Sequence, residues 1–236
     1  MSEALDKIRK KIIISCQASS GEPIYEENCL LSIIKSVING GASGLRLAGV
    51  RDIKATKKFS DIPIIGITKP DPLPENWKEI VYITPTFEDA KRISDAGADI
   101  IAIDGTSRKR PKENLAELIE KIKNELNKPV MADCATVEEG LMCSLMGADI
   151  ISTTLSGYTQ DTLDKNNEEP DFEFLKSLVK ILNCPIILEG RIWTVEHARQ
   201  AFDFGAHAVV IGSAVTRPQL ITKRFVDLAQ NNGEIK

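Results

Sequence analysis

The sequence predicts an α/β fold, a (β/α)₈ barrel, from two patterns that alternate along the chain. In the first, a Gly–Ala pair leads into an apolar run, as in "AGADIIAIDG" (96–105). Glycine can end a helix in a left-handed conformation, and a run that is apolar throughout fits a sheet buried on both faces. In the second, a proline opens the run, as in "NCPIILEGR" (183–191). Proline stops the preceding helix and favours the extended backbone of a strand.

Eight candidate strands follow from these patterns. The Gly–Ala pattern occurs four times, the proline pattern occurs three times, and the run "KIIISCQ" supplies the first strand. The segments are 11–17, 40–49, 61–69, 96–105, 127–135, 146–155, 183–191 and 204–213.

Amphipathic stretches separate these strands and predict helices at 26–39, 52–59, 87–96, 113–125, 137–146, 171–182, 195–204 and 218–230. Thr136 stands three residues before Glu139, which is the spacing of a capping box. Thr86 and Thr194 begin weaker versions of the same signal. We also expect a short helix before the first strand. Eight βα units in about 220 residues fit a barrel, and a doubly wound sheet is the competing architecture.

One segment does not follow the alternation. The proline-rich "PDPLPENWKEIVYITPT" (70–86) lies between the third strand and its helix. We expect an extended βα loop with a short additional strand in "IVYIT" (80–84). Such a loop lies on the face where barrels of this kind carry their chemistry.

Composition indicates one soluble domain over residues 1–236. With 42% hydrophobic residues the chain can form one large core, and no linker or shift in composition divides it. No apolar run approaches the roughly 18 residues of a membrane span, and the charged start "MSEALDKIRKK" does not resemble a signal peptide. We therefore expect a cytoplasmic protein without a membrane partner.

Charge, cysteines and histidines exclude other classes of protein. A net charge of −4 argues against nucleic-acid binding, which needs a basic surface. The five cysteines have neither Cys-x-x-Cys spacing nor a histidine pair nearby, so neither a disulfide framework nor a zinc site is expected. His197 falls in a helix and His207 at the start of a strand, and both are interpreted as structural. We therefore expect no metal ion.

Polar residues end most of the predicted strands. Because the active site of a (β/α)₈ barrel gathers at the carboxyl ends of its strands, these residues are the candidates. Lys69 and Arg46 are favoured, since each follows an apolar run, whereas Asp104 could equally cap the next helix. For Thr153 and Thr154 a structural role is the more favoured interpretation. The strand-end residues are Gln17, Arg46, Lys69, Asp104, Asp133, Thr153, Thr154, Glu189, Gly212 and Ser213.

Glycines follow the last two strands, in Glu189-Gly190-Arg191 and Gly212-Ser213. Barrels commonly hold a phosphate on backbone amides in these two loops, so a phosphate site is expected there. Arg217 can add a charge-assisted contact. Arg191 either contacts the phosphate or caps the rim, and the sequence leaves both interpretations open.

The motifs together resemble the N-acetylmannosamine-6-phosphate 2-epimerase family of phosphate-binding (β/α)₈ barrels. The resemblance runs from about residue 8 to residue 230, with the motifs in order. They read "IISCQ", "GLRLAGVRDIKATK", "PIIGITK", "ITPTFEDAKRISDAGADIIAIDGTSRKRP", "ADCAT", "GADIISTTLSGYT", "EGR" and "GSAVTRPQLITKRF".

This resemblance implies an isomerase that interconverts N-acetylmannosamine 6-phosphate and N-acetylglucosamine 6-phosphate in sialic acid breakdown. It implies no redox cofactor, a small phosphosugar as the partner, and a homodimer. Lys69 of "GITK" and Glu189 of "EGR" would be the catalytic pair. The remaining matched positions would contact the substrate, with Arg217 and the loop amides at its phosphate; these positions are Gln17, Arg46, Asp133 and Arg217.

Two loops depart from the family pattern. After the lysine the family usually has Arg-Asp and a short connection, whereas this chain has Pro70-Asp71-Pro72 and a longer loop. After "EGR" a Thr-Pro pair is usual, and Trp193-Thr194-Val195 stands there instead. The departures concern the loops around the site and leave the two catalytic positions in place.

Inversion at C2 of a 2-acetamido sugar requires a carbonyl next to the C–H bond, so the ring must open first. Lys69 can remove that proton only when neutral, and lowering its pKa from about 10.4 to about 7–8 corresponds to roughly 3–4.5 kcal/mol. Burial and the positive charge of the neighbouring Arg46 could lower the pKa by this amount. Glu189 would be the second acid/base group. Two alternatives remain: a Schiff-base aldolase or synthase that uses Lys69, and a phosphosugar-binding regulator without activity.

Overall fold

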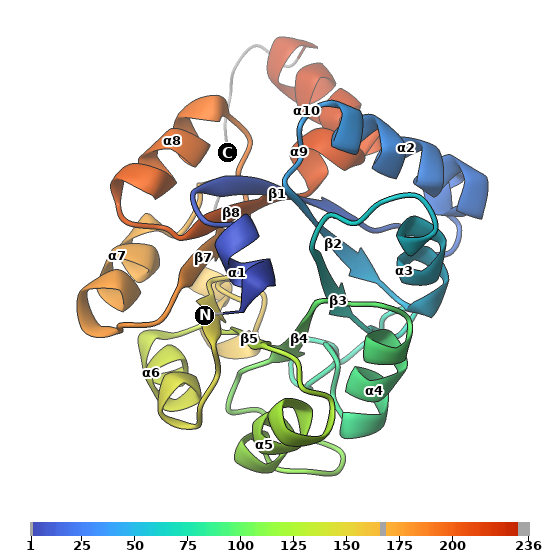
Figure 1. Ribbon diagram of the computed structural model, residues 1–236. Coiled ribbons are helices and arrows are strands. Elements are labelled where there is room, and N and C mark those ends of the chain that lie inside the picture. Colours follow the sequence, from blue (N-terminus) through green and yellow to red (C-terminus); the bar gives the residue numbers. More distant parts are fainter. Residues whose placement is uncertain (1, 166–168, 231–236) are drawn as a thin grey trace.

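A computed structural model describes residues 2–165 and 169–230. Eight parallel strands close into a barrel in the order of the sequence, β1 to β8, with β8 pairing back onto β1 (Figure 1). This confirms the predicted (β/α)₈ barrel and excludes the doubly wound sheet. The strands are β1 (Lys11–Cys16), β2 (Gly44–Ala48), β3 (Ile64–Ile67), β4 (Ile100–Asp104), β5 (Val130–Asp133), β6 (Ile150–Ser152), β7 (Ile186–Glu189) and β8 (Ala208–Ile211).

Helices surround the barrel, and each predicted helix is present with ends within two residues of the expected ones. They are α2 (Glu27–Asn39), α3 (Val50–Lys57), α4 (Phe87–Asp95), α5 (Leu115–Glu125), α6 (Val137–Leu145), α7 (Phe172–Ile181), α8 (Val195–Asp203) and α10 (Pro218–Gln230). Among the described residues, four short helical segments add to these: α1 (Glu3–Lys7), η1 (Pro23–Tyr25), η2 (Gln160–Lys165) and α9 (Ser213–Thr216).

The local signals act as the sequence predicts. The glycines of the four Gly–Ala pairs all have left-handed φ angles, between 95° and 109°, and each is the second residue after the end of a helix; they are Gly41, Gly97, Gly147 and Gly205. Thr136 and Glu139 form the predicted capping box. The hydroxyl groups of Thr86 and Thr194 each accept a hydrogen bond from the amide three residues later. Each βα unit therefore begins and ends through its own short-range contacts.

Two apolar layers hold the barrel together. One lies between the strands and the surrounding helices, and the other fills the barrel interior with side chains such as Ile65, Met131 and Ile187. Helix α1 lies across the amino-terminal end of the barrel, where Leu5 is buried and its carbonyl oxygen lies 3.0 Å from Nε2 of His207 (Figure 1). Helix α1 thus covers the end of the barrel opposite the carboxyl ends of the strands.

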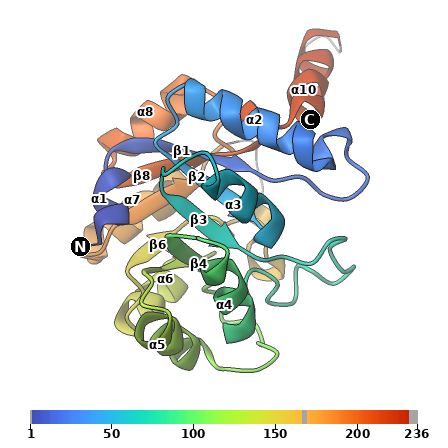
Figure 2. The same cartoon turned by 45° about the vertical axis from the view of Figure 1, so that its right-hand side comes forward.

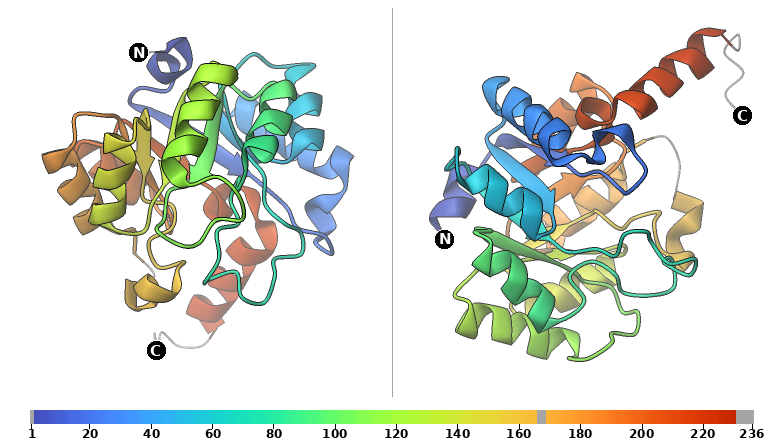
Figure 3. Two further views of the ribbon diagram at one scale, coloured as in Figure 1. Left: turned by 90° about the horizontal axis from the view of Figure 1, so that it is seen from below. Right: turned by 90° about the vertical axis from the view of Figure 1, so that its right-hand side faces the viewer.

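The long loop between β3 and α4 is present, but the prediction of a strand at 80–84 is wrong. Thr84 has a left-handed φ of 42°, and its amide makes a single backbone hydrogen bond to Thr68 O, of 2.9 Å. Val81, Tyr82 and Ile83 are buried, so the alternating apolar residues pack at the mouth of the barrel instead of extending the sheet. The loop reaches well beyond the strands, as Figures 2 and 3 show.

Within the described parts of the chain, no helix is both long and apolar enough to cross a membrane.

Candidate active site

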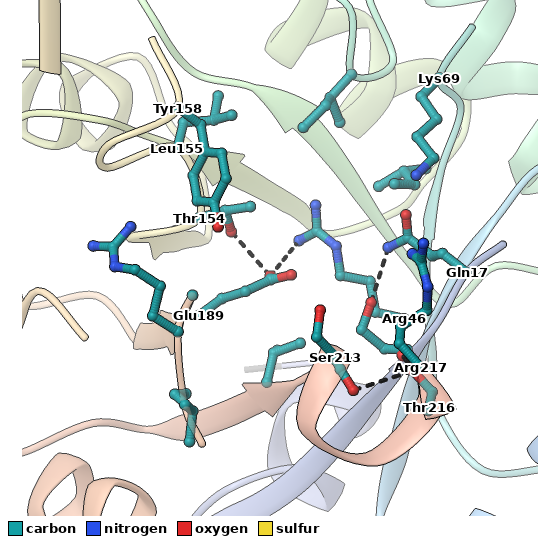
Figure 4. A pocket seen from close by; sticks show the side chains of 18 of the residues that line it. Gln17, Arg46, Lys69, Thr154, Leu155, Tyr158, Glu189, Ser213, Thr216 and Arg217 are labelled. Carbon is teal, nitrogen blue, oxygen red and sulfur yellow. Dashed lines mark hydrogen bonds and ion pairs between the residues drawn. The ribbon is translucent and has the colours of Figure 1, made fainter. Parts of the chain in front are cut away.

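A cavity of about 290 Å³ lies at the carboxyl ends of the strands (Figure 4). The structure brings most of the candidate residues, Thr154 among them, into its wall, whereas Asp104, Asp133 and Thr153 are not part of the lining. The predicted residues that line it are Gln17, Arg46, Lys69, Glu189, Gly190, Arg191, Gly212, Ser213 and Arg217.

Arg46 on β2 is the central cation of this site. Its side chain is only 1% exposed, and it forms ion pairs with two carboxylates. Nη1 and Nη2 donate to the two oxygens of Asp133, at 3.0 and 2.5 Å, while Nη1 also lies 2.9 Å from Oε2 of Glu189. Burial alone would lower the pKa of Arg46, but Asp133 and Glu189 outweigh it and raise the pKa. Arg46 therefore keeps its charge in a fixed position.

Asp133 lies beneath Arg46 at the end of β5 and is fully buried. A buried charge is tolerated when it is paired and hydrogen-bonded, and the two parallel contacts to the guanidinium fulfil that condition. The structure thus places Asp133 behind the cavity wall, where it holds Arg46.

Glu189 ends β7 and lies against Arg46 with its side chain 14% exposed. Burial raises the pKa of Glu189 to about 7. Arg46 opposes this rise in pKa, and the negative charge of Asp133 adds to it. The hydroxyl group of Thr154 and the ammonium group of Lys69 also oppose it. A carboxyl group with a pKa near neutrality can both give and take a proton at physiological pH.

Lys69 follows β3. In the view of Figure 4, it lies on the other side of the Arg46 guanidinium from Glu189. Burial lowers the pKa of Lys69, and the positive charge of Arg46 lowers it further. Asp71 and Glu189 act in the opposite direction on this pKa. Burial and Arg46 are the two causes that the sequence suggested. A lowered pKa increases the fraction of neutral amine, which is the form that can accept a proton.

Two glycine loops and Arg217 form the other end of the cavity. Gly190 has a φ of 114°, a conformation that favours glycine, and it brings the backbone after Glu189 to the cavity surface. Gly212 and Ser213 stand between β8 and the short helix α9. Arg217 forms an ion pair with Glu22. Gln17 lines the same cavity as Arg217, and its Nε2 donates to the hydroxyl of Ser15 at 2.9 Å (Figure 4).

The side chain of Arg191 donates both of its described hydrogen bonds to backbone carbonyl oxygens. Nη1 donates to Ser156 O and Nε donates to Glu169 O, each at 2.7 Å. Both acceptors belong to the segment between β6 and α7. Of the two roles that the sequence left open for Arg191, this geometry favours a structural contact at the rim.

Several strand-end residues have structural contacts outside the cavity wall. Asp104 is fully buried, accepts from the amide and hydroxyl of Thr106, and pairs with Arg108 at 2.7 Å. The hydroxyl of Thr153 donates to Glu189 O and accepts from Glu189 N, so it braces the backbone of β7. Neither histidine lines the cavity.

Sequence reasoning missed or undervalued other parts of the wall. The sequence favours a structural role for Thr154, yet its hydroxyl lies 2.9 Å from Oε2 of Glu189 and lines the cavity. The signal that could have indicated its place in the cavity wall is its position at the end of a strand. Tyr82, Leu155 and Tyr158 also line the cavity, but they stand within loops whose course the sequence pattern does not indicate.

Comparison with known proteins identifies close relatives over almost the whole chain. A family model described as "Putative N-acetylmannosamine-6-phosphate epimerase" matches residues 31–231. A protein of Mycoplasma mycoides named "Putative N-acetylmannosamine-6-phosphate 2-epimerase" is 43% identical over 224 residues, which cover 94% of this chain and 97% of that protein. A protein of the same name from Clostridioides difficile is 42% identical over 230 residues and is covered in full, with 97% of this chain.

A comparison with solved structures identifies the same family. The N-acetylmannosamine-6-phosphate 2-epimerase of Clostridium perfringens superposes with a TM-score of 0.89 at 40% identity, covering 96% of each chain. Thiamine phosphate pyrophosphorylase from Pyrococcus furiosus, at 15% identity and a TM-score of 0.59, shares the fold alone.

The fold and the site define a (β/α)₈-barrel enzyme whose ionisable side chains meet at the carboxyl ends of the strands. Its central features are a buried arginine, a carboxyl group with a raised pKa and a lysine with a lowered one. The chain belongs to the N-acetylmannosamine-6-phosphate epimerase family.

Proposed function

We propose that this protein is an isomerase that interconverts N-acetylmannosamine 6-phosphate and N-acetylglucosamine 6-phosphate by removing and returning the proton at C2. The observation that carries the proposal is the pair formed by Lys69 and Glu189. These two groups line one cavity, and burial displaces both pKa values toward neutrality from opposite sides. Family membership supports this substrate. In this proposal the reaction serves the breakdown of sialic acid.

The chemistry begins once the sugar ring is open and C1 is an aldehyde. Neutral Lys69 takes the proton from C2, and the electron pair of the broken C–H bond moves into the C1–C2 bond while negative charge develops on the C1 oxygen. Fixed cations such as Arg46 are suited to stabilise that charge, because they need no reorganisation during the reaction. Protonated Glu189 then supplies a proton to C2 from the opposite face, which inverts the centre. The reverse reaction exchanges the two roles.

The remaining residues bind and position the substrate in this proposal. The amides of Gly190, Gly212 and Ser213 and the side chain of Arg217 receive the phosphate, in the pair of loops that commonly does so in such barrels. Gln17, the residue after β1, contacts the open sugar chain. Asp133 acts through Arg46 without touching the sugar, because Arg46 covers it.

A turnover experiment in D₂O tests the proposal. The purified protein with N-acetylmannosamine 6-phosphate is expected to produce the C2 epimer, with deuterium at C2 of the product, as followed by proton NMR. Both groups of the pair exchange protons with solvent between turnovers, which is the reason for the deuterium. Binding without turnover, detected as thermal stabilisation by the sugar phosphate, would contradict the proposal and favour a regulator. Inversion without deuterium would indicate return of the same proton.

We further propose a homodimer in which helix α10 contacts a second copy. None of its residues is buried, and Phe225, Val226 and Leu228 are 71%, 41% and 42% exposed. The helix extends away from the barrel (Figures 2 and 3). Apolar side chains gathered on a projecting helix are typical of an interface with another chain.

Phe225→Glu is therefore expected to convert the dimer to a monomer, because it places a charge in the buried centre of the interface. Sedimentation equilibrium measures the change. Lys223→Glu introduces the same acid on the other side of α10 and is the matched control, expected to remain dimeric. A wild-type monomer at micromolar concentration would refute the interface.

We propose that the protein acts in the cytoplasm. A phosphate monoester carries about −1.5 to −2 charges at pH 7, so a phosphosugar does not cross a bilayer unaided. Cell fractionation with the activity as marker checks this location.

A further inference from the structure

The hydroxyl group of Thr154 lies between two carboxylates. Its oxygen is 2.9 Å from Oδ1 of Asp133 and 2.9 Å from Oε2 of Glu189. Nη1 of Arg46 contacts the same two oxygens, at 3.0 and 2.9 Å. Asp133 and Glu189 are thus bridged twice, once by a cation and once by a neutral hydroxyl (Figure 4 shows the contacts to Glu189).

The direction of the hydrogen bonds at Thr154 follows from its other neighbour. The hydroxyl of Ser152 lies 2.7 Å from that of Thr154, and either could donate to the other. If Thr154 donated to Ser152, its oxygen lone pairs would face two carboxylate oxygens without a proton between them. The favourable order is therefore Ser152 donating to Thr154, and Thr154 donating to a carboxylate. Each donation polarises the next, which strengthens the second bond.

The two carboxylates depend on that proton unequally. Asp133 accepts two parallel hydrogen bonds from Arg46 and is fully buried in this position. Glu189 has one contact with Arg46, through Nη1. A further donor therefore contributes more to the orientation of the Glu189 carboxyl group than to that of Asp133.

We propose that Thr154 is a positioning residue for Glu189: its hydroxyl, oriented by Ser152, donates to the ionised carboxylate and holds it against Arg46. This inference rests on the proposed function only in that Glu189 is taken as the acid/base group. Thr154 itself moves no proton to or from the substrate.

The consequence concerns the balance between the two protonation states of Glu189. The charged groups that face this carboxyl are Arg46 from β2, Lys69 from the loop after β3 and Asp133 from β5. Tyr82, from the loop between β3 and α4, acts on Arg46. All of these remain when the hydroxyl of Thr154 is removed. What is lost is a donor to the ionised form, so the pKa of Glu189 rises above its value of about 7.

A carbon-13 NMR titration of the glutamate side-chain carboxyls, in protein without substrate, measures this directly. The Glu189 signal is assigned as the one that disappears in Glu189→Gln. Thr154→Val, which keeps the shape but lacks the hydroxyl, is expected to raise the midpoint by about one pH unit. Thr154→Ser is expected to restore it. Ser152→Ala is expected to raise it by a smaller amount, since the donor loses its orientation.

Thr153→Val is the matched control. Thr153 is the neighbouring threonine and also contacts Glu189, but only through backbone atoms, so the midpoint is expected to stay within about 0.3 units while the melting temperature falls. A midpoint that is unchanged or lower in Thr154→Val overturns the proposal. If Thr154→Val does not fold, an unshifted midpoint in Ser152→Ala does the same. Because no turnover is measured, these outcomes are independent of the identity of the substrate.

Discussion

Replacing Lys69 by methionine is expected to lower kcat by about 10³-fold or more while leaving the barrel folded. Methionine fills the space of the lysine stem but has no proton to exchange, and a positioned general base contributes about 10²–10⁴-fold. Lys69 is half-buried, and burial and Arg46 lower its pKa, which increases the fraction of neutral amine that can accept the C2 proton. The NMR assay with N-acetylmannosamine 6-phosphate measures kcat, and circular dichroism checks the fold.

Lys54→Met, on the exposed side of α3, is the matched control and is expected to keep wild-type kcat. Near-normal turnover in Lys69→Met would remove Lys69 from the mechanism. The Schiff-base alternative has a separate signature: borohydride added to wild-type protein with substrate would leave a covalent adduct on Lys69. We expect no change in mass after that treatment.

Glu189→Gln is expected to lower kcat for inversion by about 10²–10⁴-fold, yet to keep one half of the reaction. The amide preserves the size of the side chain, and Arg46 keeps its two contacts with Asp133. Lys69 is still able to remove and return a proton on its own face of C2. The variant should therefore exchange the C2 proton of one epimer with D₂O without forming the other epimer.

Proton NMR separates the two outcomes, since exchange removes the C2 signal and inversion creates new signals. Glu173→Gln, on the exposed surface of α7, serves as the control for the chemical change alone. Inversion at the wild-type rate in Glu189→Gln would show that Lys69 serves both faces. If both exchange and inversion were lost, Glu189 would also be needed for the first step, the removal of the C2 proton.

Much of this site follows from the sequence because a barrel of parallel strands brings all of its strand ends to one edge. The Gly–Ala and proline signals act within a few residues, so they predict the strand boundaries and hence the residues that follow them. Lys69 follows β3 and Glu189 ends β7, far apart in sequence, yet the parallel direction of the strands is enough to place both at the same end.

The sequence pattern does not predict how deep in the barrel each strand-end side chain lies. Asp133 and Glu189 both end strands, but one lies under Arg46 and the other reaches the cavity. This difference depends on how neighbouring strands are staggered and on which way the long arginine side chain turns. The error at 80–84 has a related cause: an alternating run fits a strand, but here its apolar residues are buried within a loop.

The closure of β8 onto β1 also determines when the catalytic cavity can exist during folding. Lys11–Ile14 pair with Ala208–Ile211, and the hydroxyl of Thr216 donates to Ser15 O at 2.8 Å. These contacts join residues nearly two hundred positions apart, so they are among the most costly to form in chain entropy and the slowest to appear. Gln17 and Arg217 stand on either side of this seam. A growing chain on the ribosome therefore remains without a substrate cavity until its last strand has emerged.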